Sequence, residues 1–415
     1  MKNPETLSDP VIDVGSDYLR SRSEQVQNGF LARHIKALFK NAQVGEITVV
    51  VKGRAPIVHR GMYPGSKVTL EICNWRAVWK YLTSGELGFA DAFISGDLNI
   101  DSPGNLFSWY LANEEAVVNT PSATWLTGLW NRFTHKFLNN NNRSGSRKNI
   151  SYHYDLGNDF YREWLDPTMS YSSGDFSKTT CLEQSQHAKY ARICDAIDIQ
   201  SGDRVLEIGC GWGGFAEHVV SRYGAEYKGI TISREQLAYA QKRLENEPSA
   251  DLVFEDYRDT QGKFDKIVSI EMFEAVGENH WPTYFETLKE RLAENGRASI
   301  QVITIDHDRF LKYRDKVDFI QKYIFPGGML PSKEAFREHA NAAGLTVTDC
   351  FAFGPDYAET LRRWRESFIT SWPRLQQQGF DDRFYRMWLY YLEYCEAGFD
   401  AGTIDVVQFS LRHQD

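Results

Sequence analysis

Three glycines at alternate positions are the clearest chemical signal in the sequence, because they end a short apolar run within residues 203–214 (DRVLEIGCGWGG). The run is long enough for one buried strand, and a helical pattern begins at Phe215. Gly209, Gly211 and Gly213 are therefore expected to form a strand–turn–helix loop. Glycine accepts positive φ and allows close approach to a ligand, and loop N–H groups can bind a carboxylate or phosphate.

The spacing of this loop separates two kinds of ligand. A dinucleotide site needs GxGxxG and an acidic residue about 20 residues later. Here the pattern is ExGxGxG, it includes Glu207, and the next expected strand (227–232) is followed by Ser233 rather than by an acid. This pattern is typical of S-adenosylmethionine sites, because that cofactor has no pyrophosphate. An ordinary βα turn without a ligand is the alternative.

The composition is that of a globular protein with 42% hydrophobic, 25% charged and an unusually high 14% aromatic residues in 415. No run approaches the ~20 apolar residues of a transmembrane helix, and the first residues do not resemble a signal peptide. A net charge of −9 disfavours a nucleic-acid partner but allows a local basic patch to contact a membrane. Six scattered cysteines without CxxC spacing predict no disulfide framework, no metal site and a cytoplasmic location.

Three regions differ in pattern along the chain. Residues 1–115 predict a small α+β domain with an amphipathic helix at 25–42, strands on either side of a turn at 64–66, and further helices. The helix at 25–42 would pack on its own domain or contact a membrane surface. Residues 116–150 predict a helical, basic linker, which is either solvated or a contact for anionic lipid headgroups.

Residues 151–415 alternate between strand and helix patterns, which predicts an α/β domain with a mostly parallel, Rossmann-like sheet. Insertions at 305–332 and 355–400 interrupt this alternation. The expected strands are 204–208, 227–232, 251–254, 265–270, 297–304, 346–353 and 404–411. Seven strands with a long helical stretch before the last one are typical of methyltransferases, in which the last strand is antiparallel.

The sequence resembles the cyclopropane-fatty-acyl-phospholipid synthases and their fatty-acid C-methyltransferase relatives over most of its length. The most specific stretches are SYHYDLGNDFYREWLDPTMSYSS (151–173), LEIGCGWGG (206–214), IVSIEMFEAVG (267–277) and YIFPGGMLPS (323–332). The resemblance implies a seven-stranded methyltransferase domain after a lipid-associated N-terminal domain. It also implies a homodimer, peripheral contact with the inner face of the membrane, and unsaturated membrane phospholipid as substrate.

The resemblance, together with the loop pattern, assigns S-adenosylmethionine to one set of residues. Hydroxyl and amide groups of the set suit the ribose, and an acid after the third strand suits the adenine amine. Ser233 could instead cap the following helix, or do both. The expected cofactor residues are Tyr171, Ser172, Glu207, Gly209, Gly211, Gly213, Thr231, Ser233, Gln236, Asp256 and Tyr257.

The implied reaction makes demands on the surroundings. An alkene is a weak nucleophile, so the methyl donor must be held close and in line, and the resulting carbocation must be kept from water near aromatic faces. The two insertions are rich in aromatic residues and could form a lid and an acyl tunnel, although each aromatic alone fits core packing. They are Phe310, Tyr313, Phe319, Tyr323, Phe325, Trp364, Phe368, Trp372, Trp388 and Tyr391.

The last step decides the product. In the synthases a bound bicarbonate removes a proton so that the ring closes, and its Glu, Tyr and carbonyl ligands match Glu274, Tyr357 and Ile270. The Cys and His positions hold Ser173 and Gln301, and glutamine cannot become cationic. Bicarbonate is therefore a weaker expectation than S-adenosylmethionine.

These substitutions favour a methyl-branched unsaturated chain over a cyclopropane. Glu274 is the expected proton-transfer or cation-stabilising residue, and Tyr357 is expected to orient it. A methyltransferase for a soluble small molecule and an inactive lipid- or cofactor-binding protein are the other hypotheses. The aromatic insertions disfavour the first of these, and the complete glycine loop disfavours the second.

Overall fold

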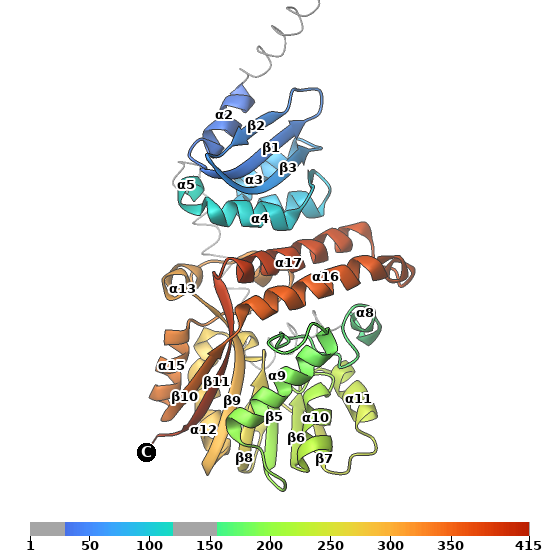
Figure 1. The fold of residues 1–415 in the computed structure, drawn as a ribbon, viewed down its shortest axis with the longest axis vertical. Helices are drawn as coiled ribbons and strands as arrows, with labels where there is room; N and C mark the ends of the chain where they lie inside the picture. Colours follow the sequence, from blue (N-terminus) through green and yellow to red (C-terminus); the bar gives the residue numbers. More distant parts are fainter. Residues whose placement is uncertain (1–29, 119–155, 415) are drawn as a thin grey trace, which may run out of the picture.

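The computed structural model describes residues 30–118 and 156–414. These residues form a small N-terminal unit, a layer of two long helices and a larger unit built on a seven-stranded sheet (Figure 1). Most of the expected linker and the start of the 151–173 motif lie outside the described residues. The domain boundaries near 115 and 150 therefore stay predictions.

The N-terminal unit is an α+β fold with a four-stranded sheet in the order β2-β1-β3-β4. Side chains of β1 alternate between buried and half-buried, as expected for a strand with one covered face. Its elements are α2 (Phe30–Phe39), β1 (Val44–Val51), β2 (Ile57–Arg60), β3 (Tyr63–Ile72), α3 (Arg76–Ile94), β4 (Leu98–Ile100), α4 (Pro103–Ala112) and α5 (Glu114–Val118).

The prediction of a turn at 64–66 is wrong. These residues belong to β3, which runs parallel to β1 with a shift in register between Val44 and Glu46. A bulge of this kind accommodates proline and glycine inside a strand, where an ordinary ladder would not.

The larger unit contains the alternating elements that the sequence predicts. Its strands are β5 (Arg204–Ile208), β6 (Glu226–Thr231), β7 (Ala250–Phe254), β8 (Phe264–Ile270), β9 (Leu292–Ile305), β10 (Leu345–Ala352) and β11 (Ile404–His413). Its covering helices are α8 (Asn158–Arg162), α9 (Leu182–Ile197), α10 (Gly214–Tyr223), α11 (Arg234–Arg243), α12 (Trp281–Arg291) and α15 (Lys333–Ala342), with short 3₁₀ turns η1 (Tyr257–Asp259), η2 (Phe273–Ala275) and η3 (Glu278–His280).

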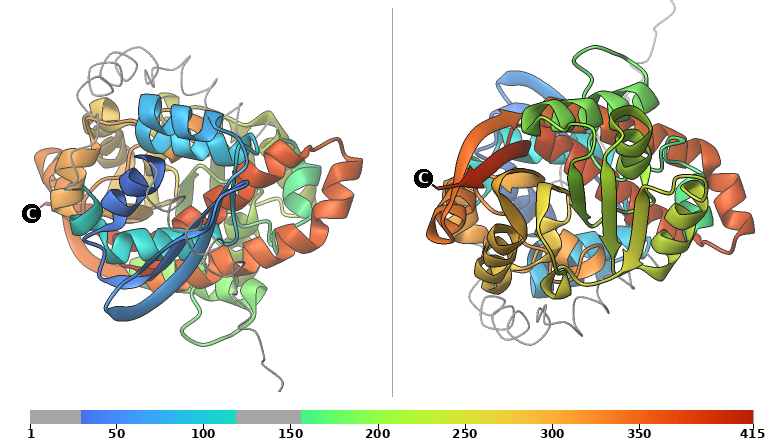
Figure 2. Two further views of the ribbon diagram at one scale, coloured as in Figure 1. Left: turned by 90° about the horizontal axis from the view of Figure 1, so that it is seen from above. Right: turned by 90° about the horizontal axis from the view of Figure 1, so that it is seen from below.

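The sheet order is β10-β11-β9-β8-β5-β6-β7, and only β11 pairs antiparallel to its neighbours. This confirms the predicted Rossmann-like methyltransferase sheet. Helices α9, α10 and α11 share one apolar cluster with the sheet, whereas α12 and α15 share another. Helices consequently cover both faces (Figure 2), and the carboxyl ends of β5, β6 and β8 meet at one edge, where ligands bind in such sheets.

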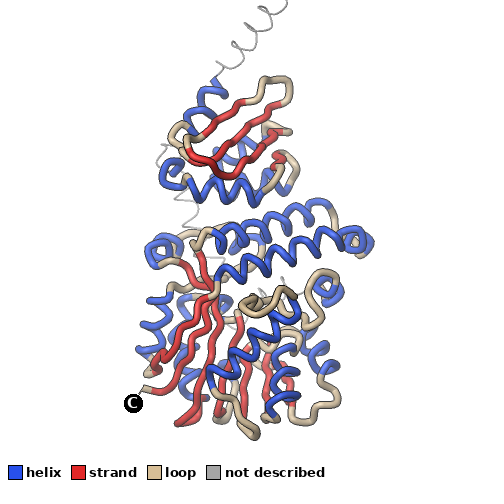
Figure 3. Tube along the Cα trace, in the orientation of Figure 1, coloured by secondary structure: helices blue, strands red, loops and turns tan. Residues whose placement is uncertain are grey.

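Both insertions are helical. The first forms α13 (His307–Tyr313) and α14 (Phe319–Tyr323), and the second forms a hairpin of α16 (Gly354–Gln377) and α17 (Asp382–Asp400). Figure 3 shows this hairpin as a layer between the strands of the two units. None of the helices in the described parts of the chain has the length and apolarity needed to cross a bilayer.

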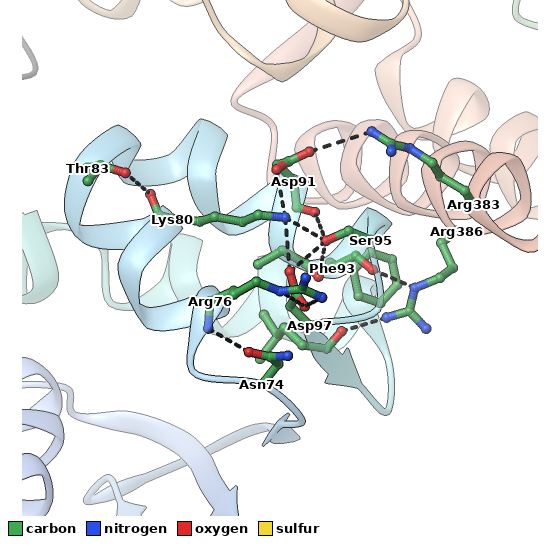
Figure 4. Close-up of polar contacts among 12 residues, drawn as sticks. Asn74, Arg76, Lys80, Thr83, Asp91, Phe93, Ser95, Asp97, Arg383 and Arg386 are labelled. Carbon is green, nitrogen blue, oxygen red and sulfur yellow. Dashed lines mark hydrogen bonds and ion pairs between the residues drawn. The ribbon is translucent and has the colours of Figure 1, made fainter.

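Helices α3 and α4 of the N-terminal unit pack against α17. Arg386 of α17 donates to the carbonyl oxygens of Phe93 and Leu98, each at 2.5 Å, and lies over the Phe93 ring. Arg383 pairs with Asp91 at a longer 3.8 Å (Figure 4). The two units therefore share a packed boundary with fixed polar contacts.

Candidate active site

The glycine loop lies between β5 and α10 at the carboxyl edge of the sheet. Gly209, Gly211 and Gly213 all have positive φ, at 86°, 52° and 81°. A Cβ at Gly211 would project into open space, whereas one at Gly209 would lie 2.9 Å from Met272. The loop therefore needs glycine for its backbone, and at Gly211 it leaves room for a ligand.

A cavity of about 2430 Å³ opens over this loop. Most of the expected cofactor residues line it: Tyr171, Ser172, Glu207, Gly209, Gly211, Thr231, Gln236, Asp256 and Tyr257. Two of the expected residues do not. Gly213 packs toward Ala240, and the Ser233 side chain accepts from the Gln236 N–H at 3.3 Å, so its helix-capping role is the one the structure contains.

The polar groups around the loop suit S-adenosylmethionine. Thr231 donates to the Gln236 amide oxygen at 3.2 Å, which places a hydroxyl and an amide side by side after β6. The Asp256 carboxylate lies at the cavity but is held by the Arg258 guanidinium at 2.8 and 2.6 Å. Together with the open loop, these groups offer contacts for a carboxylate, a ribose and an adenine.

Glu207 is buried at the end of β5, where Tyr227 donates to its carboxylate. Burial raises the pKa of Glu207 to about 8, although the tyrosine and Lys189 oppose this. Lys189, which sequence analysis missed, is also fully buried, and burial lowers its pKa to about 8. Its ammonium donates to Ser172 Oγ at 2.6 Å; no spacing in the sequence marks this helical lysine as part of the site.

The same cavity continues past the loop between the insertions and into the N-terminal unit. Ile47 and Val49 of β1, Leu70 of β3 and Trp109 of α4 line its far end, and Tyr390 of α17 lines its middle. Charged residues such as Glu86, Arg309 and Asp318 line it as well, but most of its walls are apolar. A pocket of this kind has room for a cofactor next to an apolar substrate chain.

The aromatic residues of the insertions divide into two groups. Tyr313, Phe319, Phe325 and Tyr391 line the cavity. Phe310 instead stacks on Trp281, and Trp364, Phe368, Trp372 and Trp388 pack in the aromatic core of the hairpin. Tyr323 packs at a tilt against Phe319 and does not line the cavity. The tunnel expectation therefore applies to fewer residues than the sequence indicates.

Glu271 is a half-buried carboxylate that was not among the site residues expected from the sequence. It binds groups that were expected to have other partners. Its carboxylate accepts from the Ser173 backbone N–H at 2.9 Å, the Gln301 amide at 2.7 Å and the Tyr357 hydroxyl at 2.5 Å. The expected pairing of Tyr357 with Glu274 is therefore wrong. The sequence position of Glu271 could have identified it as a site residue, because it directly follows Ile270, the last residue of β8, at the binding edge of the sheet.

Glu274 also lies at the cavity, one short turn later. One oxygen accepts from the Ile303 N–H at 2.6 Å, and the other has no hydrogen-bond partner among the described residues. Burial and the neighbouring Glu271 raise the pKa of Glu274 to about 8. Burial also raises the pKa of Glu271, but its three donors and Lys189 oppose that shift. Glu271 is thus the better stabilised anion of the pair.

Comparison with known proteins gives a consistent result. The family model for mycolic acid cyclopropane synthetase matches residues 141–409. Tuberculostearic acid methyltransferase UfaA1 of Mycobacterium tuberculosis is 38% identical over 341 residues, which are 79% of each chain. The cyclopropane-fatty-acyl-phospholipid synthase of Escherichia coli K12 is 35% identical over 368 residues, 86% of this chain and 90% of the relative.

Solved structures agree. The crystal structure of mycolic acid cyclopropane synthase CmaA1 complexed with SAH and CTAB has 31% identity and a TM-score of 0.60. The match covers 64% of this chain and 97% of that one. With the glycine loop, the sheet order and these matches taken together, the chain belongs to the mycolic acid cyclopropane synthetase family of S-adenosylmethionine-dependent methyltransferases.

Proposed function

We propose that the protein methylates the cis double bond of unsaturated phospholipid acyl chains and releases a methyl-branched unsaturated chain. One observation carries this proposal: the cavity over the glycine loop continues as an apolar passage into the N-terminal unit. A soluble, polar substrate would have little use for such walls, whereas an acyl chain would bury its methylenes along them at about 0.8 kcal/mol each.

When bound, S-adenosylmethionine supplies an electrophilic methyl group. The loop at Gly209–Gly213 would hold its carboxylate end, Thr231 and Gln236 its ribose, and Asp256 with Tyr257 its adenine. Tyr171 and Ser172 would close the cavity next to the reacting carbon, since both line it. Tyr171 donates to or accepts from Tyr391 at 2.8 Å, and this bond fixes an aromatic face where positive charge develops.

The N-terminal unit is the proposed membrane-facing part. Trp75, Trp79 and Leu82 lie at one-turn spacing on and beside α3 with 52%, 69% and 54% of their surface exposed. Large apolar side chains on an exposed helix are typical of interfacial contact. Tyr81 and Leu82 also line the cavity, so this surface adjoins its far end. The expected homodimer and the inner-membrane location remain proposals that rest on the family resemblance.

Ring closure to a cyclopropane is the second candidate function. It is favoured by Glu274 and Ile270 at the cavity, where the synthases would have bicarbonate ligands, and by the Escherichia coli relative. Against it, Ser173 and Gln301 do not line the cavity. To bind an anion, the Gln301 amide would have to turn away from Glu271 and the Ser173 hydroxyl from the Gly174 carbonyl.

Mass spectrometry of acyl chains tests both candidates. The protein is incubated with vesicles of mono-unsaturated phospholipid and S-adenosylmethionine carrying a trideuterated methyl group. Three retained deuterons in an unsaturated chain are the expected result and mean an intact methyl branch. Two retained deuterons mean a cyclopropane or a methylene group, which gas chromatography separates. Absence of label from all lipids would exclude the proposed substrate.

A further inference from the structure

Three hydrogen-bond donors surround Glu271 in the way that an anion-binding site surrounds its ligand. Here the anion is the side-chain carboxylate of Glu271 itself. Its carboxylate accepts three bonds, from Ser173, Gln301 and Tyr357. Gln408 of β11 donates to the Gln301 amide oxygen at 3.0 Å and thereby turns the Gln301 amide nitrogen toward Glu271. These three donors belong to residues that the family resemblance assigns to bicarbonate.

The backbone at this position is unusual. Glu271 has φ of 52°, one of only three positive values among the non-glycine residues that the structure describes. Its N–H donates to the Gln301 carbonyl at 2.8 Å, which continues the β8–β9 pairing past the end of the strand. This backbone conformation is unfavourable for residues other than glycine. A glutamate held there is consistent with a role for its carboxylate.

We propose that the Glu271 carboxylate occupies the place of the bicarbonate ion and accepts the proton that leaves the substrate, so that turnover needs no bicarbonate. This inference rests on the proposed function. These residues do not fit a separate bicarbonate ion, because the donors that would bind it already bond Glu271. A bicarbonate ion would also lie beside the carboxyl groups of Glu271 and Glu274.

Glu271 acts after the methyl group has been transferred. The alkene π electrons form the bond to the incoming methyl carbon, and the electrons of the broken methyl–sulfur bond stay on sulfur. The acyl chain is left with one positive charge. Glu271 then takes a proton from a carbon next to the cation, directly or after a hydride shift, and the C–H electrons form the new π bond. The carboxylate becomes neutral and later returns its proton to solvent.

Anion binding tests the place of Glu271 without any lipid. Glu271→Gly removes the carboxylate, suits the positive φ, and leaves the three donors facing an empty space. Calorimetry and ¹³C NMR with labelled bicarbonate, and with formate, should show binding to this variant and none to the wild-type protein. Equal binding to both proteins would overturn the proposal, whatever the substrate is.

Turnover with vesicles tests the role of Glu271. In carbon dioxide-depleted buffer the wild-type rate should stay unchanged, and Glu271→Gly should lose roughly 100-fold, as expected for loss of a general base. Added formate or bicarbonate should restore at least a tenth of the rate. Bicarbonate dependence of the wild type, or full activity of the variant without an added anion, would contradict the role.

Two controls keep the outcomes separate. Asp198→Gly relieves another positive φ, at 56°, on the exposed end of α9 outside the cavity, and should behave as the wild type. Glu271→Gln keeps the shape of the side chain and should be inactive and not rescued by formate. If the wild type labels no lipid, the proposed function fails, while anion binding still decides whether Glu271 occupies the bicarbonate place.

Discussion

At the level of single residues, Glu271 and Glu274 show how two nearby carboxyl groups acquire different properties. Three donors hold Glu271, whereas Glu274 has one donor and a pKa raised to about 8. A carboxyl group that stays neutral near pH 7 can lie beside an ionised one without repulsion. The pair thus favours an anionic Glu271 beside an uncharged Glu274.

The raised pKa of Glu274 predicts a dependence of stability on pH. The ordinary pKa of this carboxyl is 4.5 and the folded value is about 8, so the folded protein keeps a proton that the unfolded chain has released. Stability from this group is full below the ordinary value and is lost as the pH rises through 8. The pKa of Glu207 is also raised to about 8, so Glu207 adds a further loss of stability as the pH rises.

Urea unfolding of the cofactor-free protein at pH 6 and pH 8.5 measures this effect. The free energy of unfolding of the wild type should decrease from pH 6 to pH 8.5. That of Glu274→Gln should decrease less, because the amide stays neutral. Parallel changes in the two proteins would show that Glu274 is already ionised at pH 6.

The loop glycine at the cavity gives a second prediction at this scale. Gly211→Val adds a β-branched side chain to a residue with φ of 52° and directs it into the space over the loop. Affinity for S-adenosylmethionine, measured by calorimetry, should fall roughly 100-fold or more, equivalent to about 3 kcal/mol. Wild-type affinity would contradict the assignment of the loop.

Gly202→Val is the matched control. Gly202 has φ of 84°, a Cβ there would also project into open space, and the residue does not line the cavity. This variant should lose stability from backbone strain, by about 1–2 kcal/mol, and keep its affinity for the cofactor. The comparison separates filling the loop from straining a turn.

Sequence reasoning identified many of the residues at the cavity and misassigned the contacts between them. Tyr171, Glu207 and Glu274 all line the cavity, and each lies in a stretch with a recognisable pattern: Glu207 in β5 before the glycine loop, Glu274 just after β8, and Tyr171 in the 151–173 motif. The pairing of Tyr357 with Glu271 depends on a rotamer and on the approach of α16, which no local pattern encodes. Lys189 was missed because only the folded structure brings its buried ammonium against Ser172.

At the level of elements, α17 forms both a wall of the cavity and a platform for the N-terminal unit. Cys395 of α17 lines the cavity, and Cys395→Phe would fill part of the passage without reaching the glycine loop. Lipid methylation should fall roughly 10-fold or more while cofactor affinity stays unchanged, because overpacking acts locally. Steady-state turnover with vesicles and calorimetry with the cofactor measure the two effects.

Cys350→Phe provides the same change at a half-buried cysteine of β10 that does not line the cavity. It should cost stability without selective loss of lipid turnover. If both variants lose methylation equally, the passage is not the route of the acyl chain.

The elements themselves were largely predictable from the sequence. All seven strands of the large sheet overlap their expected positions, and the central ones, β5 and β8, are buried apolar runs between clear turns. The start of β9 lies five residues before the expected one, because its first residues are largely polar. The short strands β2 and β4 of the N-terminal unit were missed, since four or three residues carry too little pattern. The second insertion was expected to be aromatic and helical, but the pairing of its two helices as a hairpin depends on packing against the rest of the fold.

At the scale of the whole molecule, Arg386 is one of several polar links across the boundary of the two units, beside the Arg309–Glu114 ion pair and the bond from the Gly104 N–H to Glu393. Arg386→Ala removes the donors to two backbone carbonyls, Phe93 and Leu98, and should cost about 1–3 kcal/mol if they stay buried. Thermal unfolding and limited proteolysis of the full chain should show a less stable N-terminal unit, and lipid turnover should fall with it.

Arg383→Ala is the control for this prediction. Its pair with Asp91 is longer and its side chain is 63% exposed, so its loss should cost at most about 1 kcal/mol. Equal effects of the two variants would mean that general charge, rather than the paired carbonyls, holds the boundary. Neither contact could be predicted from sequence, because the partners are almost 300 positions apart.

The cavity that crosses from the catalytic sheet into the N-terminal unit has a thermodynamic consequence. A chain bound along it would touch both units at once, and its binding energy would add to the energy that holds them together. Bound lipid would then stabilise the contact between the two units, and a molecule without lipid would open at this boundary more readily than one with lipid bound. Release of the modified chain and loosening of the two units would be a single coupled event.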